Sequence, residues 1–395
     1  MSGAQLFVDL TQFVSEPARS GVQRVLMELI RNWPAAGIAA DVGYAANGSY
    51  AIVPREHAAD ALRGYFETDR AMADPASRLD RCVRARVAAG ELISRYSAYL
   101  LPEPSYRAEV LDVLCQWRHE RPRSTFALFF DALPLTDPQH FRAPHQLATS
   151  RYFRELSQVE NVACISAASL NTLVGRLRRR PASNAMVLPL GADALASGAA
   201  AKPSAPPAFV CVATVEPRKN HAVILAAFNR LWRAGADFHL HFIGAQGACP
   251  DAFLADLSGL LAAEPRRFRW SRDTNDAAVR DALSEATAAL FLSEAEGYGL
   301  PAVEALAAGC PIIVSSSLPA LENLPALGQL RLDAVSVETV ADAVRQAAEP
   351  DFNARLRREV STLRLPTWRE TAAQLAQWIR ITLDGAAAEL KGSGA

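Results

Sequence analysis

Two glutamates, Glu296 and Glu304, stand eight positions apart in the segment E-A-E-G-Y-G-L-P-A-V-E-A, residues 294–305. The apolar run 288–292 before them is typical of a buried strand, and Pro301 suits the first turn of a helix. This pattern places Glu296 at the carboxyl edge of a sheet and Glu304 one turn into the next helix. Backbone N–H groups at that helix start would face the same crevice, where they suit the anionic or hydroxyl-rich end of a ligand.

Each glutamate taken alone could be a solvated side chain of an ordinary strand-to-helix turn. The whole string, however, resembles the E-x7-E signature of retaining glycosyltransferases of family 4, E-G-[FY]-G-L-P-x-x-E-A, and the continuation L-A-A-G-C-P-I-I-V-S, residues 306–315, also fits. The resemblance implies that Glu304 binds the ribose hydroxyls of a nucleotide and that Glu296 holds hydroxyls of the transferred sugar. It also assigns donor contacts to four residues of the turn: Gly297, Tyr298, Gly299 and Leu300.

A second cluster of polar residues follows the apolar run 209–214, in the string V-E-P-R-K-N-H. Asn220 is a good N-cap, so Arg218 and Lys219 would lie at the amino end of a helix, where cations oppose the helix dipole unless an anion is bound. The segment resembles the diphosphate clamp E-P-x-K of the same family, with Lys219 at its lysine. A solvated basic loop is the alternative. Many family members carry arginine where this chain has Thr214, which we expect to contact the donor.

The first half of the chain carries weaker matches. The string S-G-V-Q-R-V, residues 20–25, resembles a family segment in which a glycine, here Gly21, approaches the donor phosphates; a serine-glycine pair is otherwise a plain helix cap. Family members often have His-Asp where this chain has Phe130-Asp131. That histidine commonly bonds the donor's 6-hydroxyl, which an apolar ring cannot do, so Phe130 favours a 6-deoxy sugar or a displaced donor.

Strands and helices alternate in both halves, separated by an aperiodic Ala-, Pro- and Ser-rich segment. The alternation implies an α/β fold with two parallel, doubly wound sheets, and the resemblance implies the GT-B arrangement of two Rossmann-like domains facing across a cleft. The fingerprint G-x-G-x-x-G of dinucleotide-binding enzymes is absent. The expected division is an acceptor-binding domain 1–193 with a helical insertion near 54–123, a linker 194–207, a nucleotide-sugar domain 208–366, and a helix crossing back to the first domain plus a tail, 367–395.

Composition limits the class of protein. The chain has 395 residues, a net charge of −1 and no apolar run near the eighteen or so residues of a membrane span. No secretory signal is evident at the amino terminus, and six scattered cysteines without a C-x-x-C pair are typical of buried thiols in a reducing cytosol. We therefore expect a cytoplasmic protein, with no nucleic-acid partner, that could work at the inner face of the membrane.

The sequence predicts a retaining glycosyltransferase that moves a hexose or 6-deoxyhexose from a nucleoside diphosphate sugar to a glycan or lipid-linked glycan, in bacterial surface polysaccharide synthesis. The E-P-R-K-N variant favours a GDP-linked, mannosyl or rhamnosyl type of donor, with dTDP or UDP as other possibilities. No D-x-D sequence occurs, so no metal or other cofactor is expected. The expected catalytic residues are Glu296, Lys219, Arg218 and Asp131. Two alternatives stay open: a non-catalytic nucleotide-sugar-binding subunit, and a nucleotide-sugar epimerase on the same fold.

Arginines crowd one part of the expected insertion. We expect them either to form a basic amphipathic helix that contacts an anionic membrane surface or to be the solvated face of an ordinary packed helix. The residues concerned are Arg78, Arg81, Arg84, Arg86 and Arg95.

Overall fold

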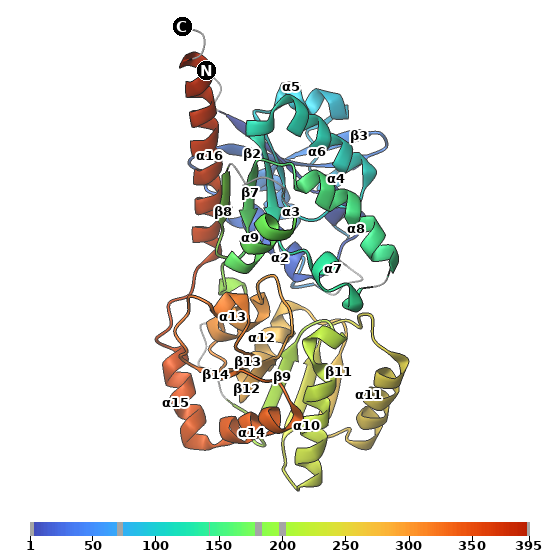
Figure 1. The fold of residues 1–395 in the computed structure, drawn as a ribbon, viewed down its shortest axis with the longest axis vertical. Helices are drawn as coiled ribbons and strands as arrows, with labels where there is room; N and C mark the ends of the chain where they lie inside the picture. Colours follow the sequence, from blue (N-terminus) through green and yellow to red (C-terminus); the bar gives the residue numbers. More distant parts are fainter. Residues whose placement is uncertain (1–3, 69–73, 142, 178–183, 197–202, 393–395) are drawn as a thin grey trace.

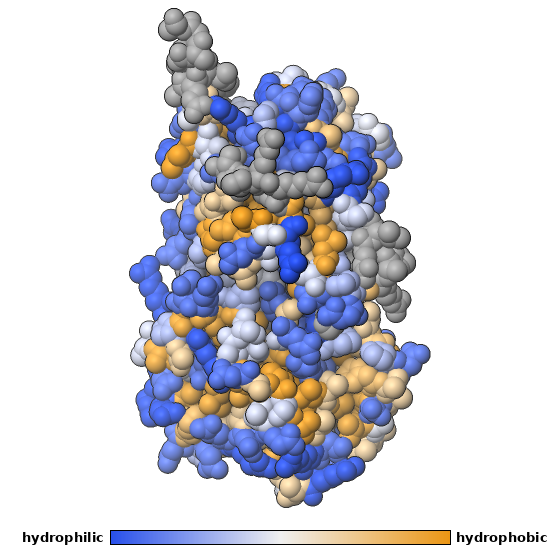
Figure 2. Space-filling model, viewed as in Figure 1, coloured by the Kyte–Doolittle hydropathy of each residue, from blue (hydrophilic) through white to orange (hydrophobic). Residues whose placement is uncertain are grey.

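The computed structural model describes residues 4–68, 74–141, 143–177, 184–196 and 203–392; residues 197–202 of the expected linker and 393–395 of the tail lie outside this description. Figure 1 shows two α/β domains stacked along the long axis of the molecule, with the last helix running back beside the first domain. Figure 2 shows hydrophilic side chains over both domains, interrupted by hydrophobic patches. Within the described residues, no helix combines the length and apolar character needed to cross a membrane.

The first domain contains an eight-stranded sheet in the order β4-β3-β2-β1-β5-β6-β7-β8. Its strands are β1 (Gln5–Asp9), β2 (Ala39–Ala46), β3 (Ser49–Pro54), β4 (Ala85–Val87), β5 (Ala98–Leu101), β6 (Thr125–Phe129), β7 (Asn161–Cys164) and β8 (Asn184–Val187). The expectation of a wholly parallel sheet is wrong at one edge, because β3 pairs antiparallel with both β2 and β4. Asn47 and Gly48 join β2 to β3 with φ of 51° and 74°, the left-handed backbone that a tight hairpin requires.

The helices of the first domain lie between these strands. The α-helices are α1 (Thr11–Ser15), α2 (Gly21–Asn32), α3 (Arg55–Ala61), α4 (Pro75–Asp80), α5 (Leu92–Arg95), α6 (Ala108–Glu120), α7 (Leu133–Thr136), α8 (Ala143–Leu156) and α9 (Ala167–Thr172). A π-helical turn, η5 (Leu173–Leu177), continues α9, and short 3-10 turns are η2 (Ala89–Glu91), η3 (Pro122–Ser124), η4 (Pro138–His140) and η6 (Asp193–Leu195).

Residues 54–123 are not a helical insertion. They contain β4 and β5, and β5 lies in the middle of the sheet, between β1 and β6. The basic amphipathic helix expected here is also wrong, because Arg78 lies in α4 whereas Arg86 lies in β4. The side chain of Arg84 pairs with Asp41 at 2.6 Å, so part of this positive charge is used inside the domain.

The second domain contains a six-stranded, entirely parallel sheet in the order β11-β10-β9-β12-β13-β14. Its strands are β9 (Ala208–Val212), β10 (His239–Ile243), β11 (Phe268–Ser271), β12 (Ala288–Phe291), β13 (Ile312–Ser315) and β14 (Gln329–Leu332). Numbered within the domain, this order is the 3-2-1-4-5-6 of doubly wound nucleotide-binding folds, in which ligands lie beyond the carboxyl ends of the two central strands. Those strands are β9 and β12, and the two predicted polar clusters follow them directly.

The helices of the second domain cover both faces of its sheet. They are α10 (His221–Arg233), α11 (Asp251–Ala263), α12 (Asp276–Glu285), α13 (Leu300–Ala307), α14 (Val337–Ala348) and α15 (Pro350–Val360), with short turns η7 (Pro217–Lys219) and η8 (Pro319–Leu321). Pro301 lies in the first turn of α13, as the sequence predicts. After α15 the chain crosses to the first domain and forms α16 (Trp368–Gly392), where buried Trp368, Leu375 and Ile379 join the apolar core of that domain.

Candidate active site

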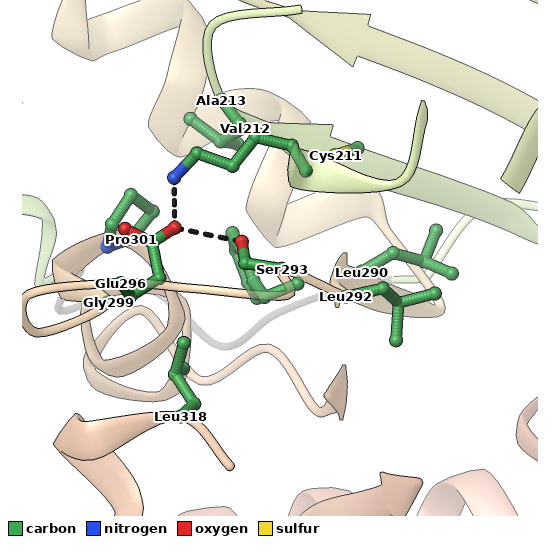
Figure 3. A pocket seen from close by; sticks show the side chains of 12 residues that line it. Cys211, Val212, Ala213, Leu290, Leu292, Ser293, Glu296, Gly299, Pro301 and Leu318 are labelled. Carbon is green, nitrogen blue, oxygen red and sulfur yellow. Dashed lines mark hydrogen bonds and ion pairs between the residues drawn. The ribbon is translucent and has the colours of Figure 1, made fainter. Parts of the chain in front are cut away.

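The loop after β12 brings Glu296 against the loop after β9. Oε1 of Glu296 accepts hydrogen bonds from Lys219 Nζ and, at 2.8 Å, from Ser293 Oγ. An Nη of Arg218 lies 3.3 Å from Oε2 of Glu296, and its other Nη pairs with Glu216 at 2.7 Å. Figure 3 shows Ser293 and Glu296 pointing toward each other beneath the strand that carries Cys211 and Val212. The two cations and the carboxylate predicted from separate motifs therefore meet in one site.

The charges in this cluster stabilise one another. Burial raises the pKa of Glu296, but Lys219 and Arg218 outweigh it and hold the pKa below its usual range. Burial also disfavours the charged form of Arg218 and so lowers its pKa. The carboxylates of Glu296 and Glu216 outweigh this effect and raise the pKa above its usual value. Glu296 is therefore an ionised carboxylate at neutral pH, in contact with two cations.

Asn220 fixes the loop that carries the two cations, but not in the way the sequence predicts. Its backbone is left-handed, with φ of 57°, and its side chain makes no N-cap hydrogen bond to α10. Instead, Nδ2 donates to the carbonyl of Leu292 at 2.8 Å, and the backbone N–H of Glu294 donates to the carbonyl of Arg218 at 2.9 Å. These bonds join the loop after β9 to the loop after β12, which positions Lys219 and Glu296 relative to each other.

Asp131 and Gly297 form the contact between this cluster and the first domain. A Cβ on Gly297 would lie 2.7 Å from the carbonyl oxygen of Phe130 and 3.0 Å from Asp131 Oδ2, so only glycine fits. The carbonyl of Gly297 accepts hydrogen bonds from Ser166 at 2.7 Å and Ser169 at 3.2 Å. Burial raises the pKa of Asp131, and Arg218 partly offsets this effect.

Glu304 lies in α13 and pairs with an arginine of the first domain. Arg24 Nε, on α2, lies 3.2 Å from Glu304 Oε1, and the two Nη atoms of Arg24 donate to Asp276 at 2.9 and 2.5 Å. The guanidinium also lies over the ring of Phe66, 4.3 Å from its centroid. All three charged side chains are at most 11% exposed, so the two domains share a buried ionic network.

The electrostatic balance at Glu304 is opposite to that at Glu296. Burial raises the pKa of Glu304 to about 7, and Arg24 lowers it only in part, since nearby Asp276 and Glu28 act in the other direction. The pKa of Arg24 is raised, because Glu304 and Asp276 outweigh the effect of burial. Arg24 is therefore shared between two carboxylates, those of Glu304 and Asp276.

Comparison with known proteins identifies similar sequences and folds. Residues 196–359 match the family model described as "Glycosyl transferases group 1". The second domain therefore matches the group 1 glycosyltransferase family, in agreement with the resemblance of its motifs. Curated relatives include "Serotype-specific mannosyltransferase WbdA" of Escherichia coli, 25% identical over 395 residues, which cover 93% of this chain and 45% of the relative. The chain thus spans about half the length of the curated relatives it matches, and the relationship is distant.

Solved structures show the fold. Sucrose-phosphate synthase from Thermosynechococcus elongatus matches with a TM-score of 0.69 and 16% identity, over 97% of this chain and 100% of that one. Anabaena HepE in complex with UDP and glucose matches with a TM-score of 0.64 and 13% identity, over 94% and 98%. WaaG, a glycosyltransferase involved in lipopolysaccharide biosynthesis, matches with a TM-score of 0.58 and 12% identity, over 94% and 99%. The GT-B fold of two Rossmann-like domains predicted from the sequence is confirmed.

The remaining predicted donor contacts lie around the same crevice. Tyr298 Oη donates to the carbonyl of Leu190 in the first domain at 3.3 Å. Gly299 has φ of 101°, and an added Cβ would collide with Leu318. Leu300 is buried in the core shared with the first domain. These three residues shape the turn, and their contact with a donor stays a prediction.

Two further predicted contacts are exposed. Gly21 begins α2 after the N-cap Ser20, and a Cβ there would meet nothing within 4 Å, so the structure gives no steric reason for glycine. Thr214 is exposed where the chain leaves β9 and faces the loop that follows β10, with its Cγ2 3.0 Å from a Cβ built on Gly247. Phe130 is 4% exposed and packs in the first domain's core, which accounts for an apolar ring at this position without reference to the donor.

Sequence reasoning missed Arg24, Asp276 and Ser293. Arg24 belongs to the same S-G-V-Q-R segment as Gly21, but at helical spacing it shares a face with Glu28 and Arg31, which is typical of a solvated polar face. Asp276 follows the N-cap Asn275 and looks like an ordinary acidic residue of a first helical turn. Ser293 directly follows the apolar run 288–292, three residues before Glu296.

Two cavities adjoin Glu296. The first, of about 20 Å³, is bounded by Lys219, Glu296 and apolar residues of β9 and β12 (Figure 3). That volume suits about one water molecule, so a sugar cannot enter while Lys219 and Glu296 are paired. The second, of about 500 Å³, is open and lies between the domains.

Proposed function

We propose that this chain is a glycosyltransferase. It would move a mannosyl or related hexosyl or 6-deoxyhexosyl group from a nucleoside diphosphate sugar, GDP-linked in our preferred assignment, to a glycan, with retention at the anomeric carbon. The observation that carries the proposal is the meeting of Glu296, Lys219 and Arg218 at the switch point of a nucleotide-binding sheet. The distant similarity to a serotype-specific mannosyltransferase supports mannose as the sugar.

Lys219 and Arg218 would hold the diphosphate. Both cations now pair with Glu296, and phosphate oxygens would replace that carboxylate as their partners. Charge-assisted bonds to phosphate are among the strongest hydrogen bonds in proteins, and they stabilise the negative charge that grows on the leaving group. The released carboxylate of Glu296 can then accept hydrogen bonds from hydroxyls of the transferred sugar.

Glu304 would bind the ribose hydroxyls of the nucleotide, as the family resemblance implies. In this structure its carboxylate pairs with Arg24, so nucleotide binding requires that this contact be exchanged or shared. In the retaining step, the bond from the anomeric carbon to the phosphate oxygen breaks. The acceptor oxygen bonds to the same face, and its proton passes to a phosphate oxygen of the leaving group.

The acceptor in this proposal is a glycan, free or lipid-linked, in bacterial surface polysaccharide synthesis, and the reaction takes place in the cytoplasm or at the inner face of the membrane. The first domain, 1–193, would hold the acceptor, and the second, 208–366, the nucleotide sugar. A non-catalytic binding subunit or an epimerase would use the same nucleotide site without a glycan.

The test begins with thermal shifts in GDP, UDP, dTDP and ADP, because a ligand at a hundred times its Kd adds about 2.7 kcal/mol to stability. We expect GDP to give the largest shift. GDP release from GDP-mannose is then followed with and without α-linked mannotriose. Release that depends on mannotriose supports a transferase, whereas isomerised donor without acceptor indicates an epimerase, and binding without turnover indicates a subunit.

A further inference from the structure

Two serines of the first domain bond the turn that follows Glu296. Ser166, the N-cap of α9, donates through Oγ to the carbonyl oxygen of Gly297 at 2.7 Å, and Ser169 Oγ lies 3.2 Å from the same oxygen. The two serines are only 4% and 2% exposed. Because Gly297 directly follows Glu296, these bonds tie the first domain to the backbone beside the proposed catalytic carboxylate.

The contacts of the two hydroxyls assign their protons, since each hydroxyl carries one. The backbone N–H of Ser169 donates to Ser166 Oγ at 2.9 Å, so Ser166 accepts a bond within its own helix and keeps its proton for Gly297. Ser169 Oγ donates to the carbonyl of Phe130, directly after β6. Ser166 is therefore the principal donor to Gly297, and Ser169 anchors the pair to the sheet edge of the first domain.

The bond from Ser166 sets the direction of one peptide group. In a trans peptide the C=O and the N–H point in opposite directions, so a Gly297 carbonyl aimed at the first domain aims the N–H of Tyr298 back toward the second. On that side Glu296 and Gly299 line the 20 Å³ cavity (Figure 3). Within the part of the chain that the structure describes, no backbone hydrogen bond uses the N–H of Tyr298. A backbone N–H is a strong donor, and this one is available for an oxygen of a ligand.

The next peptide group is held by the second domain alone. The carbonyl of Tyr298 accepts from the backbone N–H of Ala320 at 2.9 Å. Gly297, in contrast, lies against the first domain so closely that a Cβ would meet the carbonyl oxygen of Phe130 at 2.7 Å. Of these two peptide groups, the one between Gly297 and Tyr298 is therefore the one whose direction depends on the first domain.

We propose that Ser166 and Ser169 are positioning residues for glycosyl transfer. They hold the Gly297–Tyr298 peptide so that the N–H of Tyr298 donates to an oxygen of the bound nucleotide sugar, while the serines themselves do not touch that ligand. An N–H donor that is oriented in advance stabilises a reacting oxygen without reorganisation during the reaction. The first domain thus completes the donor site of the second only while the two are in contact. The nature of the ligand rests on the proposed function.

Selective isotope labelling reads this peptide directly. The chain contains three Gly-Tyr pairs, at 43–44, 64–65 and 297–298. Glycine labelled at its carbonyl carbon, combined with tyrosine labelled at its nitrogen, therefore gives three correlated NMR signals, and Tyr298→Phe identifies the one that belongs to the turn. The other two signals are internal controls.

Ser166→Ala is expected to move the Gly297 carbonyl signal upfield and to leave the two control signals in place. Ser169→Ala keeps the N-cap bond of α9, which uses the backbone of Ser169, and should move the same signal by a smaller amount. In the wild type, a bound donor should shift the Tyr298 amide proton downfield, and Ser166→Ala should abolish this shift. A shift with GDP alone identifies a phosphate oxygen as the partner, and a shift only with GDP-mannose identifies a sugar hydroxyl.

Turnover separates positioning from packing. Ser166→Ala is expected to lower kcat for mannotriose-dependent GDP release by about tenfold or more, with a smaller change in KM for GDP-mannose, and Ser166→Thr, which keeps the hydroxyl, should retain kcat. Thr371→Val is the matched control. It removes an equally buried hydroxyl-to-carbonyl bond, from Thr371 to Pro189 at 2.8 Å, and should leave kcat and the Gly297 signal unchanged.

An unmoved Gly297 carbonyl signal in folded Ser166→Ala would overturn the proposal, as would a bound donor that leaves the Tyr298 amide unchanged in the wild type. Equal kcat values for Ser166→Ala and Thr371→Val would also overturn it. Absence of nucleotide binding or turnover by the wild type would count against the proposed function alone, because the Gly297 carbonyl signal reports the direction of the peptide without any ligand.

Discussion

Glu296 and Glu304 are both glutamates, lie eight positions apart in one strand-to-helix segment, and are both largely buried. Their electrostatic environments are nevertheless opposite. Glu296 contacts two cations that belong to its own domain, and its pKa is lowered. Glu304 shares one cation, from the other domain, with Asp276, and its pKa is raised to about 7. Burial acts in the same direction on both, so the number of cations for each carboxylate decides the sign of the shift.

The comparison also separates two tasks. The ion pairs of Glu296 lie within the second domain, and bonds such as that of Asn220 to Leu292 join its loops there. The Glu304 network exists only while α2 and α13 are in contact. The first arrangement suits the chemistry proposed for Glu296, and the second makes the environment of Glu304 depend on the contact between the domains.

The largest expected effect is the loss of stability on removal of Arg24, the cation that Glu304 shares with Asp276. Arg24→Met leaves Glu304 and Asp276 buried without their cation, and loss of one partner of a buried pair costs about 3–5 kcal/mol. Chemical denaturation should show this loss. Arg31→Met, on the same helix with a side chain 62% exposed, should change stability by no more than about 0.5 kcal/mol. Equal stability of the two variants would mean that the network contributes nothing.

Glu296→Gln tests the role of the other carboxylate. It keeps the shape of the side chain and removes the charge, and we expect turnover of GDP-mannose to fall by about 10²–10³-fold, the effect of losing one transition-state contact. The affinity for GDP should not fall, because Lys219 and Arg218 lose a competitor for phosphate. Glu285→Gln, at the exposed end of α12, is the control. A parallel loss of affinity and turnover would place Glu296 in nucleotide binding instead.

Lys219→Ala removes one of the two cations that contact Glu296 and tests whether that cation binds the diphosphate. A hydrogen bond to a charged group contributes about 1.5–3 kcal/mol, so calorimetry should show GDP binding weakened by about 10- to 100-fold. Arg230→Ala removes an exposed cation of α10 that pairs with Glu338, and it should leave GDP binding unchanged. If Lys219→Ala binds GDP as tightly as the control, the diphosphate lies elsewhere.

The last prediction is a pH dependence of stability carried by Glu304. Its pKa is raised on folding from 4.5 to about 7, so the folded protein binds the proton more tightly than the unfolded chain does. Stability from this group is fully present below about pH 4.5 and is lost as pH rises toward 7, by at most about 1.4 kcal/mol per unit. Glu304→Gln should remove this slope from the unfolding free energy between pH 5 and 7. An unchanged slope would assign it to another group.

The sequence predicted the parts of the site that depend on local order. A strand, a glycine turn and a helix follow one another along the chain, so the positions of Glu296 and Glu304 could be read directly, as could the cations after β9. The pairing of Arg24 with Asp276 joins residues 252 positions apart. No local pattern contains that contact, because it depends on how the domains dock.

Other features that the sequence did not predict correctly were the antiparallel edge, strand β5 and the role of Asn220. Asn47-Gly48 is a strong hairpin signal, and it accounts for the antiparallel edge that was not predicted. Strand β5 is only four residues long and lies among arginine-rich segments, so its apolar run was too short to distinguish from a helix face. Asn220 was predicted as a cap because asparagine favours that role, but its amide bonds a neighbouring strand end instead.

The packing of α16 has a consequence for how the chain folds as it is made. Trp368, Leu375 and Ile379 complete the core of the first domain, and the backbone of Trp368 fills the space that a side chain on Gly191 would need. Domains generally fold as units as they leave the ribosome. Here the domain that begins first finishes last, because its core stays open until the whole second domain has been synthesised. During that interval the apolar surface that α16 covers in the finished protein stays exposed.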